Sequence, residues 1–262
     1  MRLFAIKIPD QPIPQETFDK LALLIEPQGR ERIKRFRLPE DALRSLVARL
    51  TMTWYLYINN LLINNELPTF GRKGKGKPIL ETPKLYPPLE FNNTHESSYI
   101  LFCLLRSNSP LSCIGIDIMS PVLNPLETQE GISLQLTIKE KLSLNLNLND
   151  IQRNEILMKF WTLKESFTKA IGEGITFGLE RIEVLLKNNN NNEIEKVKID
   201  GKDSNEIGWQ WKQDKIGKEN CIYSIWWRGE DFYPDEDCSM QNVNWEEFEK
   251  PLLELVDKLN LK

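Results

Sequence analysis

The chain has 262 residues, of which 40% are hydrophobic, so it can bury the core of one large domain or two smaller ones. Its formal net charge of −4 argues against a broadly basic nucleic-acid-binding surface, and its single histidine excludes a histidine-rich metal site or a two-histidine mechanism. No window of about 18 uncharged apolar residues occurs and no signal-peptide pattern is present, so we expect a cytoplasmic protein without a membrane span.

The first part of the chain predicts a strand and then a group of helices. Residues 1–8 alternate as a strand does and stop at a proline. Residues 15–37 indicate one or two helices, and residues 40–62 repeat apolar side chains at helical spacing. The segment 68–90 is rich in Pro, Gly and Lys, so we expect a loop there.

Two strands are predicted next, at 99–105 and 113–119, and the turn-like sequence SNSP between them suggests a hairpin. The region 121–150 allows two interpretations. Its last residues, SLNLNLND, alternate strictly like a half-buried strand, but their low complexity equally fits a loosely selected insert.

Residues 151–171 carry one apolar stripe and predict an amphipathic helix, which Gly172 and Gly174 are placed to end. Consecutive antiparallel strands are predicted beyond it, at 181–186, 194–199, 208–213 and 221–227. The asparagine run 188–192 is interpreted as a flexible hairpin loop, and residues 245–259 predict a closing helix.

Helices and strands thus occur on both sides of about residue 115, which predicts an α+β chain of two comparable halves. We place the N-terminal half at residues 1–112 and the C-terminal half at residues 113–262.

The strand 113–119 carries an acid among isoleucines. Ile114, Ile116 and Ile118 share one face, which leaves Asp117 on the other. The carboxylate could simply point to water. In company with a second acid, it could instead supply one of the oxygen ligands that Mg²⁺ prefers.

The helix 151–171 places Trp161, Glu165 and Lys169 four residues apart, on a face clear of the apolar stripe. One interpretation is an ordinary Glu–Lys pair on a solvated face. The other is that Glu165 binds a metal while Lys169 binds an anionic oxygen, a combination suited to phosphoryl chemistry. For Lys164, between them, we expect the solvated face.

Two polar segments precede the strands. The run GRKGKGKP (71–78) is either a solvated basic loop or a weak nucleic-acid patch. Its charged residues are Arg72, Lys73, Lys75 and Lys77. FNNTHESSY (91–99) contains the only histidine, His95, beside Glu96.

Four segments in this order and spacing resemble the 4′-phosphopantetheinyl transferase superfamily, in its monomeric Sfp-type branch. GIDIM (115–119) is similar to the family's G-[IV]-D motif, and FWTLKESFTKAIGEGI (160–175) is similar to its long W-x-x-K-E-[AS]-x-x-K-x-x-G-x-G motif. GKGKPIL followed by FNNTHESSY resembles its G-K-P and F-N-x-S-H segments, and RERIKRF with DALRSLVARL resembles its amino-terminal region. The residues of these motifs are most similar to those of the eukaryotic aminoadipate-semialdehyde-dehydrogenase phosphopantetheinyl transferases.

The resemblance implies two similar α/β halves in a pseudo-twofold arrangement, each an antiparallel sheet packed with helices, with coenzyme A and Mg²⁺ in the cleft between them. The implied activity is transfer of the 4′-phosphopantetheine arm of coenzyme A to a serine of an apo acyl or peptidyl carrier protein, releasing adenosine 3′,5′-bisphosphate. The implied enzyme is a monomer that binds neither nucleic acid nor membrane. Lys34, Arg35 and Arg37 could steer an acidic carrier helix, or could form a solvated helix face.

The resemblance also implies roles for individual residues. Asp117 and Glu165 would be Mg²⁺ ligands, and Lys169 would contact the pyrophosphate. Glu165 could in addition accept the serine proton. The implied coenzyme A contacts are Arg32, Arg72, Lys77, Thr94, His95 and Lys169.

One position departs from the family pattern. Many members carry a glutamate where this chain has Met119, and a thioether is a poor Mg²⁺ ligand. We therefore expect Glu96, beside His95, to supply the replacement oxygen.

Two other functions compete with catalysis. A non-catalytic module of the same fold could hold coenzyme A or a carrier protein without reacting, but the presence of Asp117, Glu165 and Lys169 argues against it. A nucleic-acid-binding protein could use the run 71–78, although no aromatic residues are interleaved with that run.

Overall fold

The computed structural model describes residues 1–64, 66–144, 147–187, 192–231 and 239–261. Up to residue 112 the described elements are β1 (Arg2–Lys7), α1 (Gln15–Ala22), α2 (Pro27–Ile33), α3 (Pro39–Ile58), β2 (Thr69–Lys73), β3 (Lys77–Thr82), β4 (Leu89–Glu96) and β5 (Tyr99–Arg106).

The elements after residue 112 begin with a strand and include the longest helix of the described chain. They are β6 (Cys113–Met119), α4 (Pro125–Gly131), η1 (Ser133–Gln135), α5 (Ile138–Leu144), α6 (Asp150–Ile171), η2 (Gly174–Phe177), η3 (Leu179–Arg181), β7 (Ile182–Leu186), β8 (Ile194–Ile199), β9 (Lys202–Asp203), β10 (Gln210–Ile216), β11 (Cys221–Arg228), β12 (Met240–Val243) and α7 (Trp245–Lys258).

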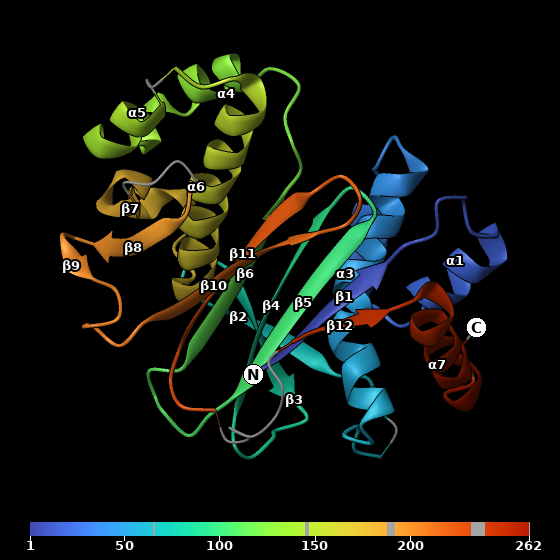
Figure 1. The fold of residues 1–262 in the computed structure, drawn as a ribbon. Helices are drawn as coiled ribbons and strands as arrows, with labels where there is room; N and C mark the ends of the chain where they lie inside the picture. The colour runs from blue at the N-terminus through green and yellow to red at the C-terminus, as the bar shows by residue number, and fades with distance from the viewer. Residues whose placement is uncertain (65, 145–146, 188–191, 232–238, 262) are drawn as a thin grey trace.

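Two main sheets, each packed with a long helix, organise the molecule (Figure 1). One has the strand order β12-β1-β5-β4 and packs with α3 and α7, while the other has the order β10-β11-β6 and packs with α6. Pairing is antiparallel except between β1 and β12, which run parallel. The predicted α+β class is confirmed.

A shared core joins the two sheets. It contains Leu3, Leu101 and Leu105 from β1 and β5, packed with Ile114 and Ile116 from β6, all fully buried. The isoleucine face predicted for the strand 113–119 is therefore the face that holds the two halves together.

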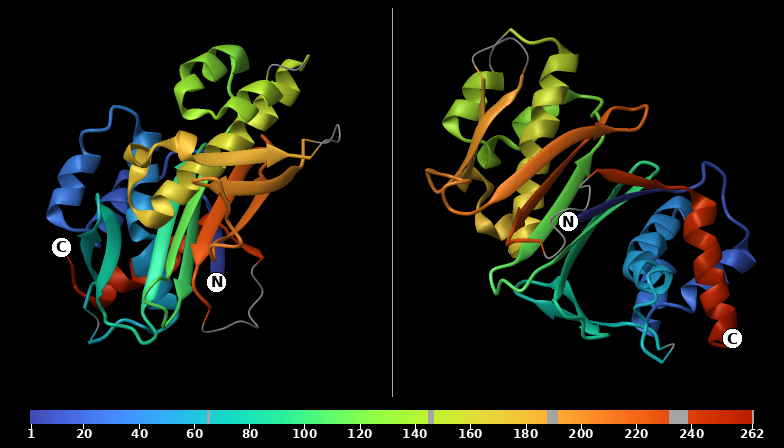
Figure 2. Two further views of the ribbon diagram at one scale, coloured as in Figure 1. Left: turned by 90° about the vertical axis from the view of Figure 1, so that its left-hand side faces the viewer. Right: turned by 60° about the horizontal axis from the view of Figure 1, so that its bottom comes forward.

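The end of the chain returns to the first half (Figure 2). β12 pairs with β1, and α7 buries Phe248, Leu252 and Leu255 in the core that α3 forms with the first sheet. A division into residues 1–112 and 113–262 therefore does not describe the packing of β12 and α7. Contacts so distant in sequence leave no local pattern, so the boundary could not be read from the chain.

Two predictions for residues 68–119 were wrong. The segment 68–90 is not all loop, because β2 and β3 form a hairpin whose tip turns at Gly74 and Gly76, with φ of 57° and 116°. Its strands are half exposed and lack apolar alternation. Strands 99–105 and 113–119 do not pair either, since β5 lies between β1 and β4 while β6 pairs with β11.

The described residues between β6 and α6 contain the helices α4 and α5 and the short helix η1, and none of them is a strand. SLNLNLND is no strand in its described part, because α5 extends to Leu144 and Asn149 caps α6 by accepting a hydrogen bond from Gln152 N at 2.9 Å. Residues 145–146 lie outside the described residues, as do residues 188–191 of the predicted asparagine loop. The helices predicted at 151–171 and 245–259 are confirmed, and so are strands in all four segments predicted between them.

Helix α6 is covered on two sides, and this overturns the solvated position predicted for Lys164. The β10-β11-β6 sheet packs on one side, and α5 with β7 and β8 packs on the other. Lys164 is fully buried between α6 and the second layer, where its Nζ lies 2.9 Å from Glu140 Oε2. It also donates to the carbonyls of Leu179 at 2.9 Å and Ile182 at 2.5 Å. Helical periodicity alone could not reveal this second layer.

Within the described part of the chain, none of the helices combines the length and the apolar character that a bilayer crossing requires.

Candidate active site

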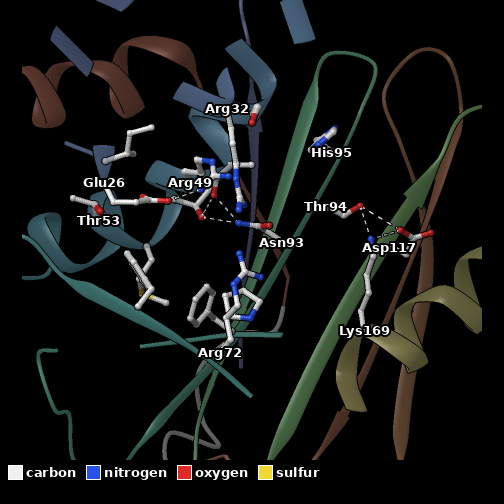
Figure 3. A pocket seen from close by; sticks show the side chains of 18 of the residues that line it. Glu26, Arg32, Arg49, Thr53, Arg72, Asn93, Thr94, His95, Asp117 and Lys169 are labelled. Atoms are coloured by element: carbon white, nitrogen blue, oxygen red, sulfur yellow. Dashed lines mark hydrogen bonds and ion pairs between the residues drawn. The ribbon is translucent and has the colours of Figure 1, made fainter. Parts of the chain in front are cut away.

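Strand β6 brings Asp117 against α6 because residue 115 is glycine. A side chain at Gly115 would collide with the backbone of α6 at Ser166 O and Ala170 N. Strand and helix can therefore approach closely, as glycine in a strand often permits. Asp117, two residues further along the same face, is then carried to the surface of α6 that presents Lys169 (Figure 3).

Asp117 is buried and engaged with two neighbours, so it does not simply point to water. Lys169 Nζ donates to Asp117 Oδ1 at 2.6 Å and to Thr94 Oγ1 at 3.2 Å. Thr94 Oγ1 in turn donates to Asp117 Oδ1 at 3.3 Å. Burial raises the pKa of Asp117, while the charge of Lys169 and these hydrogen bonds oppose the rise.

Glu165 contributes an oxygen that lacks a partner. Its Oε1 is buried and forms no hydrogen bond with any residue that the structure describes. Burial and the nearby charge of Asp117 raise the pKa of Glu165, and Lys169 opposes this increase. A buried carboxylate oxygen without a donor destabilises a fold unless a ligand compensates it. Asp117 and Glu165 therefore fit a hard divalent cation such as Mg²⁺, which takes carboxylate oxygens and completes its shell with water and phosphate.

The structure does not gather a third carboxylate. Glu96 ends β4 and lines the same cavity as Met119. Across the described ranges, however, no three Asp, Glu, His or Cys side chains lie close enough together to hold a metal ion. The geometry therefore gives no support to the prediction that Glu96 replaces the missing acid.

A cavity of about 1010 Å³ extends from this pair across to the first half. Its lining includes Arg32, Arg72 and His95, three of the predicted phosphate contacts. In Figure 3, Arg32 and Arg72 point toward the same part of the cavity from opposite walls, while Asp117 and Lys169 lie beyond β4. The arginines thus line the part of the cavity in the first half, and the Asp117–Glu165 pair lies at the other end.

His95 lies on strand β4 at the cavity wall. Partial desolvation, followed by the charges of Lys169 and Arg44, lowers its pKa from the ordinary value of 6.5. An anionic ligand would reverse this effect, since negative charge favours the imidazolium form.

Sequence reasoning missed one wall of the cavity. Ser45, Ala48, Arg49 and Met52 line it along one face of α3, and Arg49 NH1 lies 2.8 Å from Glu26 Oε1. Their spacing of three and four residues is a helical face with small and polar members. That interruption of the apolar pattern is the signal that could have identified them.

Of the four charged residues of the basic run, only Arg72 lines the cavity. Lys73 pairs with Glu90 at 2.5 Å, and Lys75 pairs with Glu173 at 2.9 Å. Lys77, predicted to contact coenzyme A, does not line the cavity and is buried elsewhere. A basic patch for nucleic acid therefore has little support, because its lysines have carboxylate partners.

Lys34, Arg35 and Arg37 are all exposed, between the end of α2 and the start of α3. Lys34 pairs with Glu31 at 2.8 Å. This arrangement fits either a surface that steers a partner or an ordinary solvated face.

A family model described as "4'-phosphopantetheinyl transferase, N-terminal" matches residues 11–104, and one described as "4'-phosphopantetheinyl transferase superfamily" matches residues 113–223.

Individual relatives agree with these matches. The chain is 31% identical over 238 residues to 4'-phosphopantetheinyl transferase pptA of Paxillus involutus, covering 85% of each chain. It is 33% identical over 168 residues to the L-aminoadipate-semialdehyde dehydrogenase-phosphopantetheinyl transferase of Xenopus laevis, covering 62% of this chain and 54% of that one. Sfp of Bacillus subtilis is 28% identical over 190 residues, 71% of this chain and 77% of that one.

Among solved structures, a holo-(acyl-carrier-protein) synthase from Bacillus anthracis aligns with 45% of this chain and 96% of its own, at 19% identity and a TM-score of 0.33. A structural similarity at that level is too low to support a family assignment. The two family models and the Paxillus relative show that the chain belongs to the 4′-phosphopantetheinyl transferase superfamily.

Proposed function

We propose that this protein transfers the 4′-phosphopantetheine arm of coenzyme A to a serine hydroxyl of an apo carrier protein and releases adenosine 3′,5′-bisphosphate. One observation carries the proposal. The unpartnered Glu165 Oε1 lies in a cavity whose other end is lined by Arg32 and Arg72. That arrangement suits a ligand with phosphates at two positions, a diphosphate bridge and a separate phosphate.

The cationic residues would bind and orient the donor. Arg32, Arg72 and His95 line the cavity where phosphate groups of coenzyme A could be held. Lys169 would contact the pyrophosphate next to the carboxylates, and its Nζ lies 2.6 Å from Asp117 Oδ1. Thr94 keeps Asp117 and Lys169 in register through its hydroxyl. Such positioning supplies most of the catalysis in phosphoryl transfer.

Mg²⁺ held by Asp117 and Glu165 would supply charge neutralisation at the pyrophosphate. In the transfer, a bond forms between the serine oxygen and phosphorus, and the bond from phosphorus to the bisphosphate oxygen breaks, with its electron pair leaving on that oxygen. Glu165 is the proposed acceptor of the serine proton, directly or through a water. Its raised pKa suits a general base.

Mass spectrometry tests the proposal directly. An apo carrier protein incubated with coenzyme A, Mg²⁺ and this protein should gain the mass of one phosphopantetheinyl group on its serine. The names of the vertebrate relatives make a carrier domain of aminoadipate-semialdehyde dehydrogenase a useful substrate beside an acyl carrier protein. Coenzyme A binding without any mass gain on either carrier would instead support the non-catalytic module.

We further propose that the enzyme acts as a monomer in the cytoplasm, as the family resemblance implies. Light scattering of the purified protein and fractionation of the source cells would test the two parts separately.

A further inference from the structure

The tip of the β2–β3 hairpin rests on the C-terminal end of α6. Lys75 N donates to Gly172 O at 3.1 Å. Gly74 and Gly172 both have positive φ, and a side chain at Gly74 would lie 3.3 Å from Gly172 O. The glycines of two separate sequence motifs therefore allow hairpin and helix to meet at backbone distance.

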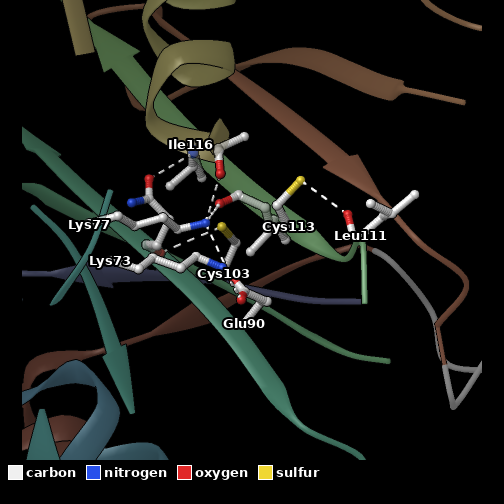
Figure 4. A network of polar contacts seen from close by, with 10 residues as sticks. Lys73, Lys77, Glu90, Cys103, Leu111, Cys113 and Ile116 are labelled. Carbon is white, nitrogen blue, oxygen red and sulfur yellow. Dashed lines mark hydrogen bonds and ion pairs between the residues drawn. The ribbon is translucent and has the colours of Figure 1, made fainter. Parts of the chain in front are cut away.

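The buried side chain of Lys77 also contributes to this contact between the hairpin and α6 (Figure 4). Its side chain is 2% exposed, and its Nζ lies 3.1 Å from Glu90 Oε2. The same Nζ donates to Ile114 O and to Ala170 O, each at 2.9 Å. Three acceptors match the three protons of an ammonium group, so Lys77 has no proton left for a phosphate.

These hydrogen-bond donors stabilise the C-terminal end of α6. The last carbonyls of an α-helix lack intrahelical partners, and the C-terminus carries a partial negative charge. Lys77 Nζ and Lys75 N supply donors to Ala170 O and Gly172 O. We call these residues, Gly74 to Lys77 with Ala170 and Gly172, the hairpin clasp.

The clasp connects the elements that carry the site. Lys77 belongs to the hairpin that bears Arg72, and it contacts β4, β6 and α6 through Glu90, Ile114 and Ala170. Those three elements carry His95, Asp117 and Lys169. Lys77 does not line the cavity itself, yet its ammonium group contacts each of these three elements, all of which line it.

We propose that Lys77 is a positioning residue: through the hairpin clasp it sets the spacing between the arginine-lined wall of the cavity and the carboxylates and lysine of the second half. This inference rests on the proposed transferase function, and it replaces the direct coenzyme A contact that the family resemblance implies for Lys77.

Two substitutions perturb the clasp by different routes. Lys77→Met removes the ammonium group, whereas Gly74→Ala keeps every charge and pushes the hairpin tip away from Gly172 O. Both should lower kcat by about 10- to 100-fold, because small misplacements of reacting groups have effects of that size. Saturating coenzyme A should not restore the rate. Gly201→Ala is the matched control, since Gly201 also has positive φ (79°) but no atom within 4 Å of an added Cβ.

Hydrogen exchange of the ligand-free variants supplies a readout that does not depend on activity. Lys77→Met and Gly74→Ala should speed exchange in the last turn of α6 and at the hairpin tip, while amides of β10 and β11 exchange as in the unchanged protein. If Lys77→Met proves too unstable to purify, Gly74→Ala alone tests the clasp in the same assays.

The proposal is overturned if Lys77→Met raises only the KM for coenzyme A while Gly74→Ala has the kinetics of the unchanged protein. That pair of results would mean that Lys77 contacts coenzyme A directly. Unchanged exchange in the last turn of α6 would overturn it as well. A wild-type protein that transfers nothing would instead contradict the proposed function, and the exchange experiment would still decide whether the clasp holds α6.

Discussion

At the scale of single residues, the site is defined by charges held in unfavourable surroundings. Asp117 and Glu165 are both desolvated and near each other, and burial raises the pKa of each. Lys169 provides partial compensation at 2.6 Å from Asp117. Such an arrangement is typical of functional sites, where a ligand supplies what the fold leaves unpaired.

Glu165→Gln should abolish most of the transfer activity without unfolding the protein. We expect kcat to fall by about 10²- to 10³-fold, the range for loss of one electrostatic contact to a transition state. Mass spectrometry of the carrier protein measures the loss, and circular dichroism checks the fold. A folded variant with full activity would contradict the role given to Glu165.

The same variant should be more stable than the unchanged protein at neutral pH in EDTA. Because the pKa of Glu165 is raised in the folded state, the carboxyl keeps its proton to a higher pH there than in the unfolded chain, where the ordinary value is 4.5. Its stabilising contribution is therefore complete below that pH and is lost as pH rises through the folded pKa. Glutamine does not ionise, so the Glu165→Gln variant does not lose stability in this way as pH rises. Calorimetry should show a higher Tm for Glu165→Gln at pH 7 and equal values near pH 4.

His95 offers a pH probe, because it is the only histidine in the chain. Its ring signals in NMR should titrate below 6.5 in the free protein, since desolvation and two cations lower the pKa. Bound coenzyme A should raise that pKa, and by linkage coenzyme A should bind more tightly as pH falls from about 8 to about 6. An unmoved titration curve would remove His95 from the phosphate contacts.

At the scale of elements, helix α6 is the centre of the second half. Its N-terminus has a capping box at Asn149, its C-terminus ends at Gly172 in the left-handed conformation, and both of its sides are covered. Glu165 and Lys169, the proposed functional residues of α6, line the cavity, and other faces of the helix are covered by packing.

Gly115→Ala tests the contact between β6 and α6. The added methyl would overlap the backbone at Ser166 and Ala170, so we expect a loss of about 1–3 kcal/mol or more in the free energy of unfolding. Activity should fall further than stability predicts, since Asp117 moves with β6. Urea titration measures the first effect. Gly131→Ala is a suitable control, because no atom lies within 4 Å of its added Cβ.

The buried pair Lys164–Glu140 holds α5 and β7 on α6. Lys164→Met leaves Glu140 buried without its cation, which should destabilise the fold by about 3–5 kcal/mol. Combining it with Glu140→Gln should recover part of the loss, because the glutamine oxygen can still accept from Val184 N or Thr137 N. Denaturant titration of both singles and the double mutant gives the coupling energy, and simple additivity would contradict the pairing.

At the scale of the whole molecule, the cavity draws on both halves, so ligand binding should stabilise them together. Coenzyme A at about 100 times its Kd should add about 2.7 kcal/mol, and chelation of Mg²⁺ should remove part of this gain. Asp117→Asn should abolish only the Mg²⁺-dependent part of the thermal shift. Arg72→Met should reduce the thermal shift with or without Mg²⁺. If Asp117→Asn and Arg72→Met changed the shift in the same way, the cavity would not have separate metal-binding and phosphate-binding ends.

Much of the candidate site could be predicted because side chains repeat with different periods in helices and in strands. Alternation in 113–119 set Asp117 opposite the isoleucines, and helical spacing set Glu165 and Lys169 on one side of α6. The family-like motifs then indicated that these residues meet. Arg49 was missed because it belongs to no such motif, although it interrupts an apolar helical pattern.

The sequence by itself determined the helix at 151–171, the four strand segments after it and the closing helix, the acids and lysine of the candidate site, and the family, because periodicity and motif spacing are local properties of the chain. Only the tertiary structure decided that Lys164 is buried, that Lys77 joins the halves, and that β12 and α7 return to the first sheet. Those outcomes depend on which distant surface covers each element, and a second layer of packing leaves no mark on a local pattern.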